Sequence, residues 1–333
     1  MIELNRIYTE SCLETLARMP DNFVDCCITS PPYWGLRDYG HDSQIGLEKT
    51  PEEYVAKMVE VFREVRRVLK KDGTLWLNLG DSYCHDRFTS KMDGTFEGTD
   101  GLYSRKFHYM DGCSSSGPKR TGGIYKTKDM MGIPWRVAFA LQADGWYLRS
   151  DIIWSKPNPM PESVTDRPTK AHEYVFLMSK KSKYYYDADA IKEPQTDSSL
   201  IRARTPYLVD LENRKHKPDD KYAPCLNPNT AEITRQKCLD GEGRNKRTVW
   251  TIPTQPYKEA HFAVFPEALV EPCILAGCPE NGVVYDPFMG AGTVAKVALR
   301  ANRQFIGSEI NPDYVKIAEK RIEPLLKQIS LFP

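Results

Sequence analysis

The chain has 333 residues, enough for one large α/β domain with insertions or for two small domains. Lys and Arg (46) almost balance Asp and Glu (45), so any attraction for a polyanion must come from local basic patches. The nine cysteines include no CxxC pair, which argues against a disulfide framework or a structural zinc site. The sequence shows no secretory signal and no apolar run long enough to span a bilayer, which argues against a secreted or membrane protein. We expect a soluble protein of a reducing cytoplasm, with no disulfide framework, membrane contact or bound metal.

Helix and strand signals alternate through the first 80 residues. Ser11 opens a capping box for a short helix, and an apolar strand follows over residues 23–29. Thr50 caps a second helix, whose apolar residues recur at helical spacing as far as Leu69. Residues 74–79 then form the next strand.

Two stretches interrupt this pattern. Residues 82–130 are rich in Gly, Ser, Asp and Lys and show no period, which predicts a mobile loop. Residues 190–250 are also irregular, and basic residues outnumber acidic ones there. Between these stretches we expect a helix over residues 133–141 and strands over 146–154 and 173–179, at the far edge of a sheet.

The C-terminal part is regular again. A helix begins near Phe265, and a short apolar strand over residues 282–286 leads into a glycine turn. A helix over residues 294–300, a strand over 304–308 and a last helix capped at Asn311 follow.

The strand over residues 23–29 leads into the turn Ser30-Pro31-Pro32-Tyr33. Two consecutive prolines fix φ and remove two backbone donors, so carbonyl oxygens and the Ser30 hydroxyl point out of the strand end beside a flat aromatic ring. Such a corner suits a planar amine. A single Pro-Pro pair more often only ends a strand, so this interpretation depends on a second signal.

The second signal is the glycine turn Gly290-Ala291-Gly292-Thr293. It fits the G-x-G-x-x-A fingerprint, and Glu309 closes the next strand about 20 residues further on. NAD and S-adenosylmethionine both carry a ribose whose vicinal hydroxyls a carboxylate can bind, so the fingerprint alone does not choose between them. Only one strand follows the glycine turn, however, and only one helix follows Glu309, so the other strands of the sheet must come from the N-terminal half.

Together the two motifs resemble those of the DNA amino-methyltransferases, which transfer a methyl group from S-adenosylmethionine to an exocyclic nitrogen of cytosine or adenine. The catalytic motif comes first and the cofactor loop last, which is similar to the permuted branch called β. The segments 154–159 and 166–173 are also similar to family segments. The resemblance covers most of the chain and implies a Rossmann-like α/β sheet in circularly permuted order, mostly parallel, with one antiparallel edge strand.

The resemblance also implies a domain organisation. Residues 1–189 and 251–333 would form the catalytic domain, with the loop over 82–130 inside it. Residues 190–250 would form the target-recognition region, because the family carries a variable region between its catalytic and cofactor halves.

For the cofactor, the resemblance implies that Asp286 lies near the methionine ammonium and that Phe288 packs beside the ligand. Where the family often has Gly-Asp near the adenine amine, this chain has Glu10-Ser11, so an adenine contact at that position is not favoured. The implied cofactor-binding residues are Asp286, Pro287, Phe288, Gly290, Ala291, Gly292, Thr293, Glu309 and Phe265.

An exocyclic amine is a poor nucleophile because its lone pair is delocalised into the ring. We expect the Ser30 hydroxyl and the Pro31 carbonyl to accept its two N–H bonds, while Tyr33 stacks on a base rotated out of the duplex. Pro32 completes the catalytic turn, and Trp34 is a second aromatic candidate. Because family members with Ser in first place most often methylate cytosine, we favour cytosine N4, with adenine N6 as the alternative.

Other interpretations remain. The fingerprint alone suits an NAD(P)-dependent oxidoreductase, and a protein that binds DNA without methylating it is the non-enzymatic alternative. Methylation at cytosine C5 needs a thiolate, and the Pro-Cys pair that ends in Cys273 lies within an apolar periodic segment, where a buried side chain is expected. Asn78 and Asp81 follow the second strand and either touch the flipped base or cap the loop.

Double-stranded DNA is the expected partner, and the candidate contacts are Arg235, Arg244, Lys246 and Arg247. A cognate restriction endonuclease and a prokaryotic or phage origin fit this interpretation. The sequence carries no signal of oligomeric state.

Overall fold

The computed structural model describes residues 2–35, 44–84, 125–126, 128–204, 228–255 and 265–331. The chain divides into two compact units, Met1–Tyr186 with Thr248–Pro333 and, between them in sequence, Asp187–Arg247. The corresponding sequence-based bounds are 190 and 250. Most of the predicted loop over 82–130 lies outside the described residues.

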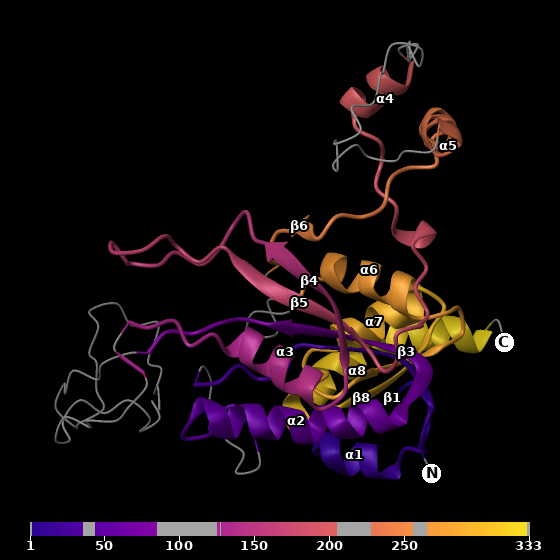
Figure 1. Cartoon of the computed structure of the whole chain (residues 1–333). Helices are drawn as coiled ribbons and strands as arrows, with labels where there is room; N and C mark the ends of the chain where they lie inside the picture. Colours follow the sequence, from indigo (N-terminus) through magenta and orange to yellow (C-terminus); the bar gives the residue numbers. More distant parts are fainter. Residues whose placement is uncertain are drawn as a thin grey trace, which may run out of the picture. The chain divides into compact units, whose positions relative to one another are not determined.

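An eight-stranded sheet forms the centre of the larger unit, in the order β1-β8-β7-β2-β3-β5-β4-β6 (Figure 1). The strands are β1 (Arg6–Tyr8), β2 (Val24–Thr29), β3 (Leu69–Leu79), β4 (Tyr147–Ser155), β5 (His172–Ser179), β6 (Val249–Thr251), β7 (Val283–Asp286) and β8 (Gln304–Ser308). β5 runs antiparallel to both of its neighbours, whereas every other neighbouring pair is parallel. The predicted mostly parallel α/β sheet is confirmed, with the difference that the antiparallel strand is internal, because β4 and β6 lie beyond it.

The strand order also shows the predicted permutation. β7 and β8 come last in the chain, yet they lie between β1 and β2: β8 pairs with β1, and β7 pairs with β2. The C-terminal strands therefore complete the centre of a sheet that the N-terminal strands begin.

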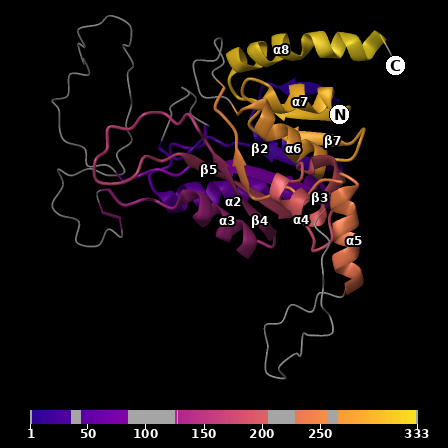
Figure 2. The same ribbon diagram turned by 90° about the horizontal axis from the view of Figure 1, so that it is seen from above.

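Helices cover both faces of this sheet. In Figure 1, α1 (Cys12–Arg18), α2 (Pro51–Val68) and α3 (Ile133–Ala143) lie below it, and α6 (Glu267–Gly277) and α7 (Thr293–Arg300) lie above it. Figure 2 shows α8 (Pro312–Leu331) beside α7. Within the described part of the chain, no helix is both long and apolar enough to cross a membrane.

Short-range signals determine where the first helices begin. The Ser11 hydroxyl accepts a hydrogen bond from the Glu14 amide (3.3 Å), and the Glu14 carboxylate accepts one from the Ser11 amide (2.9 Å). This reciprocal pair is the predicted capping box. The Thr50 hydroxyl caps α2 by accepting a hydrogen bond from the Glu53 amide (3.2 Å). Ser11 is thereby engaged as a helix cap.

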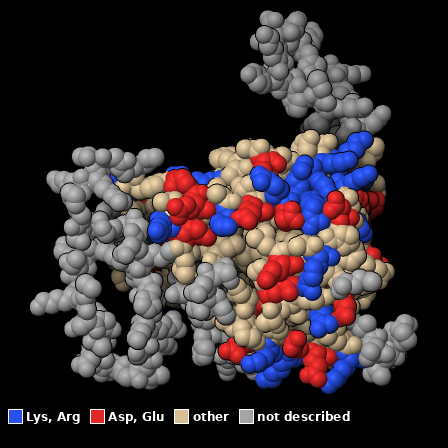
Figure 3. Space-filling view, turned by 90° about the horizontal axis from the view of Figure 1, so that it is seen from below, with Lys and Arg blue, Asp and Glu red and all other residues tan. Residues whose placement is uncertain are grey.

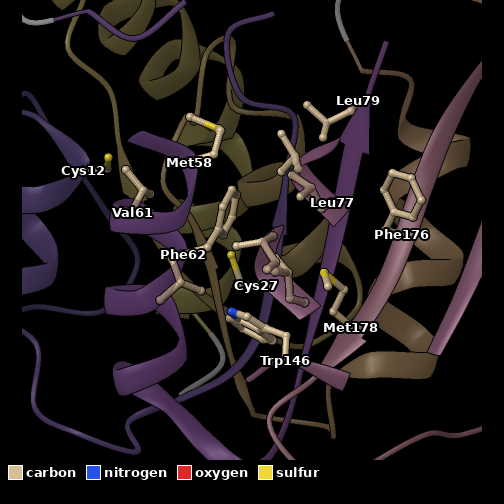
Figure 4. Packing of buried hydrophobic residues seen from close by; sticks show 14 of the residues in the cluster. Cys12, Cys27, Met58, Val61, Phe62, Leu77, Leu79, Trp146, Phe176 and Met178 are labelled. Carbon is tan, nitrogen blue, oxygen red and sulfur yellow. The ribbon is translucent and has the colours of Figure 1, made fainter. Parts of the chain in front are cut away.

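The main hydrophobic core lies between α2 and the sheet (Figure 4). α2 contributes Met58, Val61 and Phe62, and the strands contribute Cys27 and Leu77, all without exposed surface. Each fully buried large apolar side chain stabilises the fold by about 1.5–3 kcal/mol relative to an exposed one. The core therefore fixes the strands whose ends carry the polar motifs.

The smaller unit, Asp187–Arg247, contains η1 (Asp189–Ile191), α4 (Asp197–Arg204) and α5 (Pro228–Leu239). Periodicity does not predict these two α-helices, because neither segment carries an apolar stripe at helical spacing. They are joined by a hydrogen bond from the Arg235 Nε to the Ala203 carbonyl (2.8 Å). The backbones of Glu193 and Arg244 exchange two more hydrogen bonds, each of 2.8 Å.

Candidate active site

The two predicted motifs meet at the carboxyl ends of β2 and β7. The chain leaves β2 through α2 to β3 on one side, and leaves β7 through α7 to β8 on the other, so the strand order reverses between these two strands. Open α/β sheets bind their ligands at such a point. The Thr29 hydroxyl, at the end of β2, donates to the Asp286 carboxylate, at the end of β7, over 2.7 Å. Residues 257 positions apart in sequence thus share one edge of the sheet.

The proline turn is held from outside by two hydrogen bonds. The Tyr54 hydroxyl, from α2, donates to the Pro32 carbonyl over 2.9 Å. The Trp34 indole N–H donates to the Glu48 carbonyl over 2.9 Å, and its half-buried ring packs against the core. Trp34 therefore has a structural role, whether or not it also touches a base.

Tyr33 is fixed by a polar network at the neighbouring strand ends. Its hydroxyl donates to Glu173 Oε2 (2.7 Å) and lies 3.1 Å from Asn78 Oδ1, and the Ser30 hydroxyl lies 3.4 Å from it. Burial, and then the charge of Glu173, raise the pKa of the Tyr33 phenol well above its ordinary value. A Cβ on Gly80 would lie 2.6 Å from the Tyr33 ring, so the ring fits there only because this residue is glycine.

Asn78 and Asp81, the two polar residues at the end of β3, make different contacts. The Asp81 carboxylate accepts hydrogen bonds from the Ser82 amide (2.9 Å) and from the Ile133 amide at the start of α3 (3.0 Å). Asp81 therefore caps the loop and the helix. Asn78, in contrast, contacts Tyr33 directly.

The glycine turn brings β7, β8 and α7 together. Gly290 and Gly292 have positive φ angles of 52° and 75°, a conformation that favours glycine. Glu309 follows β8 and accepts a hydrogen bond from the Gly290 amide over 2.8 Å. The carboxylate predicted to bind ribose thus lies against the turn. Thr293 faces α8, where its hydroxyl accepts a hydrogen bond from Arg321 (2.9 Å).

Asp286 is the most perturbed carboxylate at this edge. Its side chain accepts hydrogen bonds from the Thr29 hydroxyl and the Phe288 amide (3.0 Å), yet burial raises its pKa from 3.8 to about 7. Pro287 and Ala291 are buried beside it, whereas Phe288 and Phe265 are half-buried. A carboxylate in this state favours a cationic ligand group, which would stabilise its ionised form.

The residues of the turn fit S-adenosylmethionine better than NAD. The cofactor needs a partner for its ammonium and an acceptor for its ribose hydroxyls, and this edge of the sheet offers two carboxylates, Asp286 and Glu309. A pyrophosphate is an anion, which an ionised Asp286 at this edge of the sheet would repel.

The candidate DNA contacts are already partly engaged within the smaller unit. Arg244 and Lys246 both lie near the Glu193 carboxylate, at 3.4 and 3.6 Å. Arg235 bonds the Ala203 carbonyl, and Arg247 is exposed. In Figure 3 basic and acidic residues are interspersed over the visible face, with one larger group of Lys and Arg, in keeping with a net charge of +1. Among the described residues, no His, Cys, Asp and Glu side chains are grouped as metal ligands would be.

Glu173 and Lys156 have no predicted role, although both lie in the segments that resemble the family. Their place at the site depends on the direction of β5: because it is antiparallel, its first residues lie at the edge where β2 and β3 end. A strand direction cannot be read from a local pattern. The pair Pro272-Cys273 does not supply the thiolate of the C5 alternative, since Cys273 is 1% exposed and its thiol contacts the Leu269 carbonyl within α6 (3.2 Å). The other Pro-Cys pair, Pro224-Cys225, lies outside the described residues.

A family model described as DNA methylase, the N6_N4_Mtase family, matches residues 24–320. The chain belongs to this family. It is a DNA methyltransferase, with S-adenosylmethionine as the methyl donor, and the oxidoreductase and binding-only alternatives are thereby excluded.

Named relatives agree with this assignment. The Type II methyltransferase M.SmaI of Serratia marcescens is 42% identical over 329 residues, covering 94% of each chain. M.Cfr9I of Citrobacter freundii is 42% identical, covering 97% of this methyltransferase and 89% of the relative.

Solved structures show the same fold at low identity. PvuII DNA methyltransferase (cytosine-N4-specific) has a TM-score of 0.58 at 18% identity, with coverage of 97% and 91%. TTHA0409 of Thermus thermophilus, complexed with S-adenosyl-L-methionine, has a TM-score of 0.53 at 21% identity, with coverage of 96% and 93%.

Proposed function

We propose that this methyltransferase modifies the exocyclic N4 of a cytosine rotated out of duplex DNA. The observation that carries the proposal is a neutral Ser30, rather than a carboxylate, at the end of β2, beside the strand end that carries Asp286. The similarity to M.SmaI and M.Cfr9I supports a site-specific enzyme of the Type II class. Adenine N6 stays the alternative substrate, because its amine needs the same acceptors.

In the proposed mechanism, Ser30 Oγ and the Pro31 carbonyl oxygen accept the two N–H bonds of the target amine. This geometry localises the nitrogen lone pair for in-line attack. Tyr33 stacks on the base through its ring, which offsets part of the stacking lost in the duplex. When bound, the cofactor supplies an electrophilic methyl group on its sulfonium. The amine proton leaves to Ser30 or to water.

Cofactor binding is proposed for the residues around the glycine turn. Asp286 would pair with the ammonium of the methionine part, and Glu309 would accept from the ribose hydroxyls. Gly290 and Gly292 let the backbone approach the ligand closely. The other proposed contacts are Pro287, Phe288, Ala291, Thr293 and Phe265.

We assign target recognition to the smaller unit, Asp187–Arg247, and the transfer reaction to the larger one. Arg235, Arg244, Lys246 and Arg247 would contact DNA phosphates. Since relatives are named Type II methyltransferases, a cognate endonuclease would share the recognition sequence, and both enzymes would act in a bacterial cytoplasm.

Mass analysis of nucleosides tests the proposal. DNA from cells that express the enzyme, compared with cells that express Ser30→Ala, should contain N4-methylcytosine. N6-methyladenine in its place would overturn the cytosine assignment while leaving the site intact. The Ser30→Ala comparison excludes methylation by the host.

A further inference from the structure

We propose that Glu173 and Lys156 are positioning residues, which hold the Tyr33 ring in place for the flipped base. The inference rests on the proposed role of Tyr33 in stacking. It identifies which residues fix that ring. It holds for either target base, because the ring would stack on the face of the base and would not contact the amine.

The pair reaches the site on paired strands rather than on a free loop. β4 ends at Ser155, which pairs with His172 at the start of β5, and the Lys156 amide donates to the Ala171 carbonyl over 2.8 Å. On its other side, β5 pairs Tyr174 with Leu79 of β3. Glu173 and Lys156 are thus fixed by hydrogen bonds between strands, and sites built on strands are held more accurately than sites on loops.

The side chains form a closed polar network. Glu173 Oε2 accepts from the Tyr33 hydroxyl (2.7 Å) and from Asn78 Nδ2 (3.2 Å), and Glu173 Oε1 forms an ion pair with Lys156. Only 15% of the Glu173 side chain and 17% of the Lys156 side chain are exposed. The Lys156 ammonium also lies 4.3 Å from the centre of the Trp154 ring.

This network determines what Tyr33 can do. Its hydroxyl is bonded to Glu173 and Asn78, which holds the ring in one orientation, and in the proposed mechanism the face of that ring stacks on the base. An ionised acceptor makes the hydrogen bond stronger than a neutral one would. Lys156 compensates for the cost of holding that carboxylate at a largely buried position.

Two double variants separate the hydrogen bond from the charge. Glu173→Gln with Lys156→Gln keeps an oxygen acceptor for Tyr33 but carries no charge. Glu173→Leu with Lys156→Met removes the nearer acceptor of Tyr33, leaves only Asn78 Oδ1 beside its hydroxyl, and leaves no buried charge unpaired. Single-turnover transfer of labelled methyl groups, with the dissociation constant of the cofactor measured by titration calorimetry, is compared for both and for Tyr33→Phe.

We expect the Gln pair to transfer within a few-fold of the wild-type rate. The apolar pair and Tyr33→Phe should each lose on the order of 10- to 100-fold, the cost of a small misplacement at a reacting centre. Adding Tyr33→Phe to the apolar pair should cause little further loss, because only the longer bond to Asn78 is left to remove, and cofactor affinity should not change. The matched control is Arg63→Met with Asp144→Leu, which removes an ion pair between α2 and the end of α3 and should leave the rate unchanged.

Several outcomes would overturn this inference and leave the proposed function standing. They are a Gln pair as slow as the apolar pair, additive losses in the triple variant, and full activity in all variants. If the apolar pair does not fold, Gly80→Ala, which pushes the Tyr33 ring directly, must lower the rate without weakening cofactor binding. A wild-type enzyme without any methyl transfer would defeat the proposed function itself.

Discussion

At the scale of single residues, Asp286 and Ser30 differ in whether their surroundings change their ionisation. Asp286 is buried at the end of β7, and two hydrogen bonds do not offset the loss of water, so its pKa rises to about 7. Ser30 stays neutral at all relevant pH values and acts through its lone pairs. The cofactor half of the site is therefore expected to depend on pH, and the amine-binding half is not.

The first prediction concerns the pH dependence of cofactor binding. A ligand ammonium stabilises ionised Asp286, so binding below about pH 7 must release a proton, and affinity should rise with pH up to that value. Above about pH 7.7–8.0 the α-amino group of the ligand loses its own charge, and affinity should fall. Calorimetry in buffers of different ionisation enthalpy measures the proton release. Asp286→Asn should bind weakly and lose the acidic limb, whereas a limb that persists would show that another group titrates.

The same shift has a consequence for folding. Because the folded-state pKa of Asp286 lies above its ordinary value of 3.8, the folded protein binds more protons than the unfolded chain between these pH values. The contribution of this residue to stability is therefore complete below about pH 4 and is lost as the pH rises through about 7. Thermal melts should show that the cofactor stabilises the enzyme more at pH 7.5 than at pH 5.5.

The second prediction compares two substitutions at the proline turn. Ser30→Ala removes one acceptor of the target amine and should lower the single-turnover rate by about 100-fold or more, with cofactor affinity unchanged. Ser30→Asp keeps an acceptor and should retain more activity than Ser30→Ala. Equal rates for the two variants would mean that no hydrogen bond at this position contributes to transfer.

At the scale of elements, the glycine turn is both a connection that requires glycine and a packing contact. Gly292 has a φ of 75°, and a Cβ at this position would lie 2.8 Å from the Ala318 Cβ of α8. The turn can therefore carry a side chain only if α8 moves. A glycine that adopts a positive φ in a turn is a local feature, and local features are predicted well from sequence.

The third prediction uses Gly292→Val, which should abolish measurable cofactor binding and destabilise the fold. Strain at a positive φ costs on the order of 1–3 kcal/mol, and the contact with α8 adds to it. Gly241→Val in the smaller unit is the matched control, because its φ is 76° but no atom lies within 4 Å of its Cβ. It should lose only the strain energy and bind the cofactor normally.

The elements that could be predicted are those with local signals. Ser11 and Thr50 mark the starts of α1 and α2, and the apolar run of β8 is found at its predicted bounds. β3 begins at Leu69 rather than at residue 74, because a bulge between the pairs Val24–Leu69 and Cys26–Thr74 continues the strand through residues with turn character. Sequence patterns do not report such long-range pairing, and for the same reason they leave Glu173 without a role.

At the scale of the whole molecule, charge is nearly balanced, with a net value of +1. Affinity for DNA therefore depends on where the basic residues lie. In the smaller unit, one acid, Glu193, lies close to both Arg244 and Lys246. Removing that acid should make both cations more available to phosphates.

The fourth prediction follows from this arrangement. Alanine at Arg235, Arg244 and Arg247 should weaken binding to any duplex and reduce the slope of log affinity against log salt by about 1 for each lost phosphate contact. Glu193→Gln should have the opposite effect and strengthen binding. Lys57→Ala on α2 serves as the control. A salt slope that none of these changes alters would remove the smaller unit from the DNA interface.

The insertion of β7 and β8 between β1 and β2 has a consequence for biosynthesis. Until the ribosome has released the chain beyond residue 308, the inner edge of β2 has no partner, and β1 cannot join β2 in one sheet. For most of its translation the nascent protein therefore carries β2, whose residues are all buried in the folded state, with one edge unpaired. An unpaired apolar strand is prone to aggregate. Late chain closure of this kind predicts slow maturation and dependence on chaperones, and it ensures that no truncated product possesses a complete reaction centre.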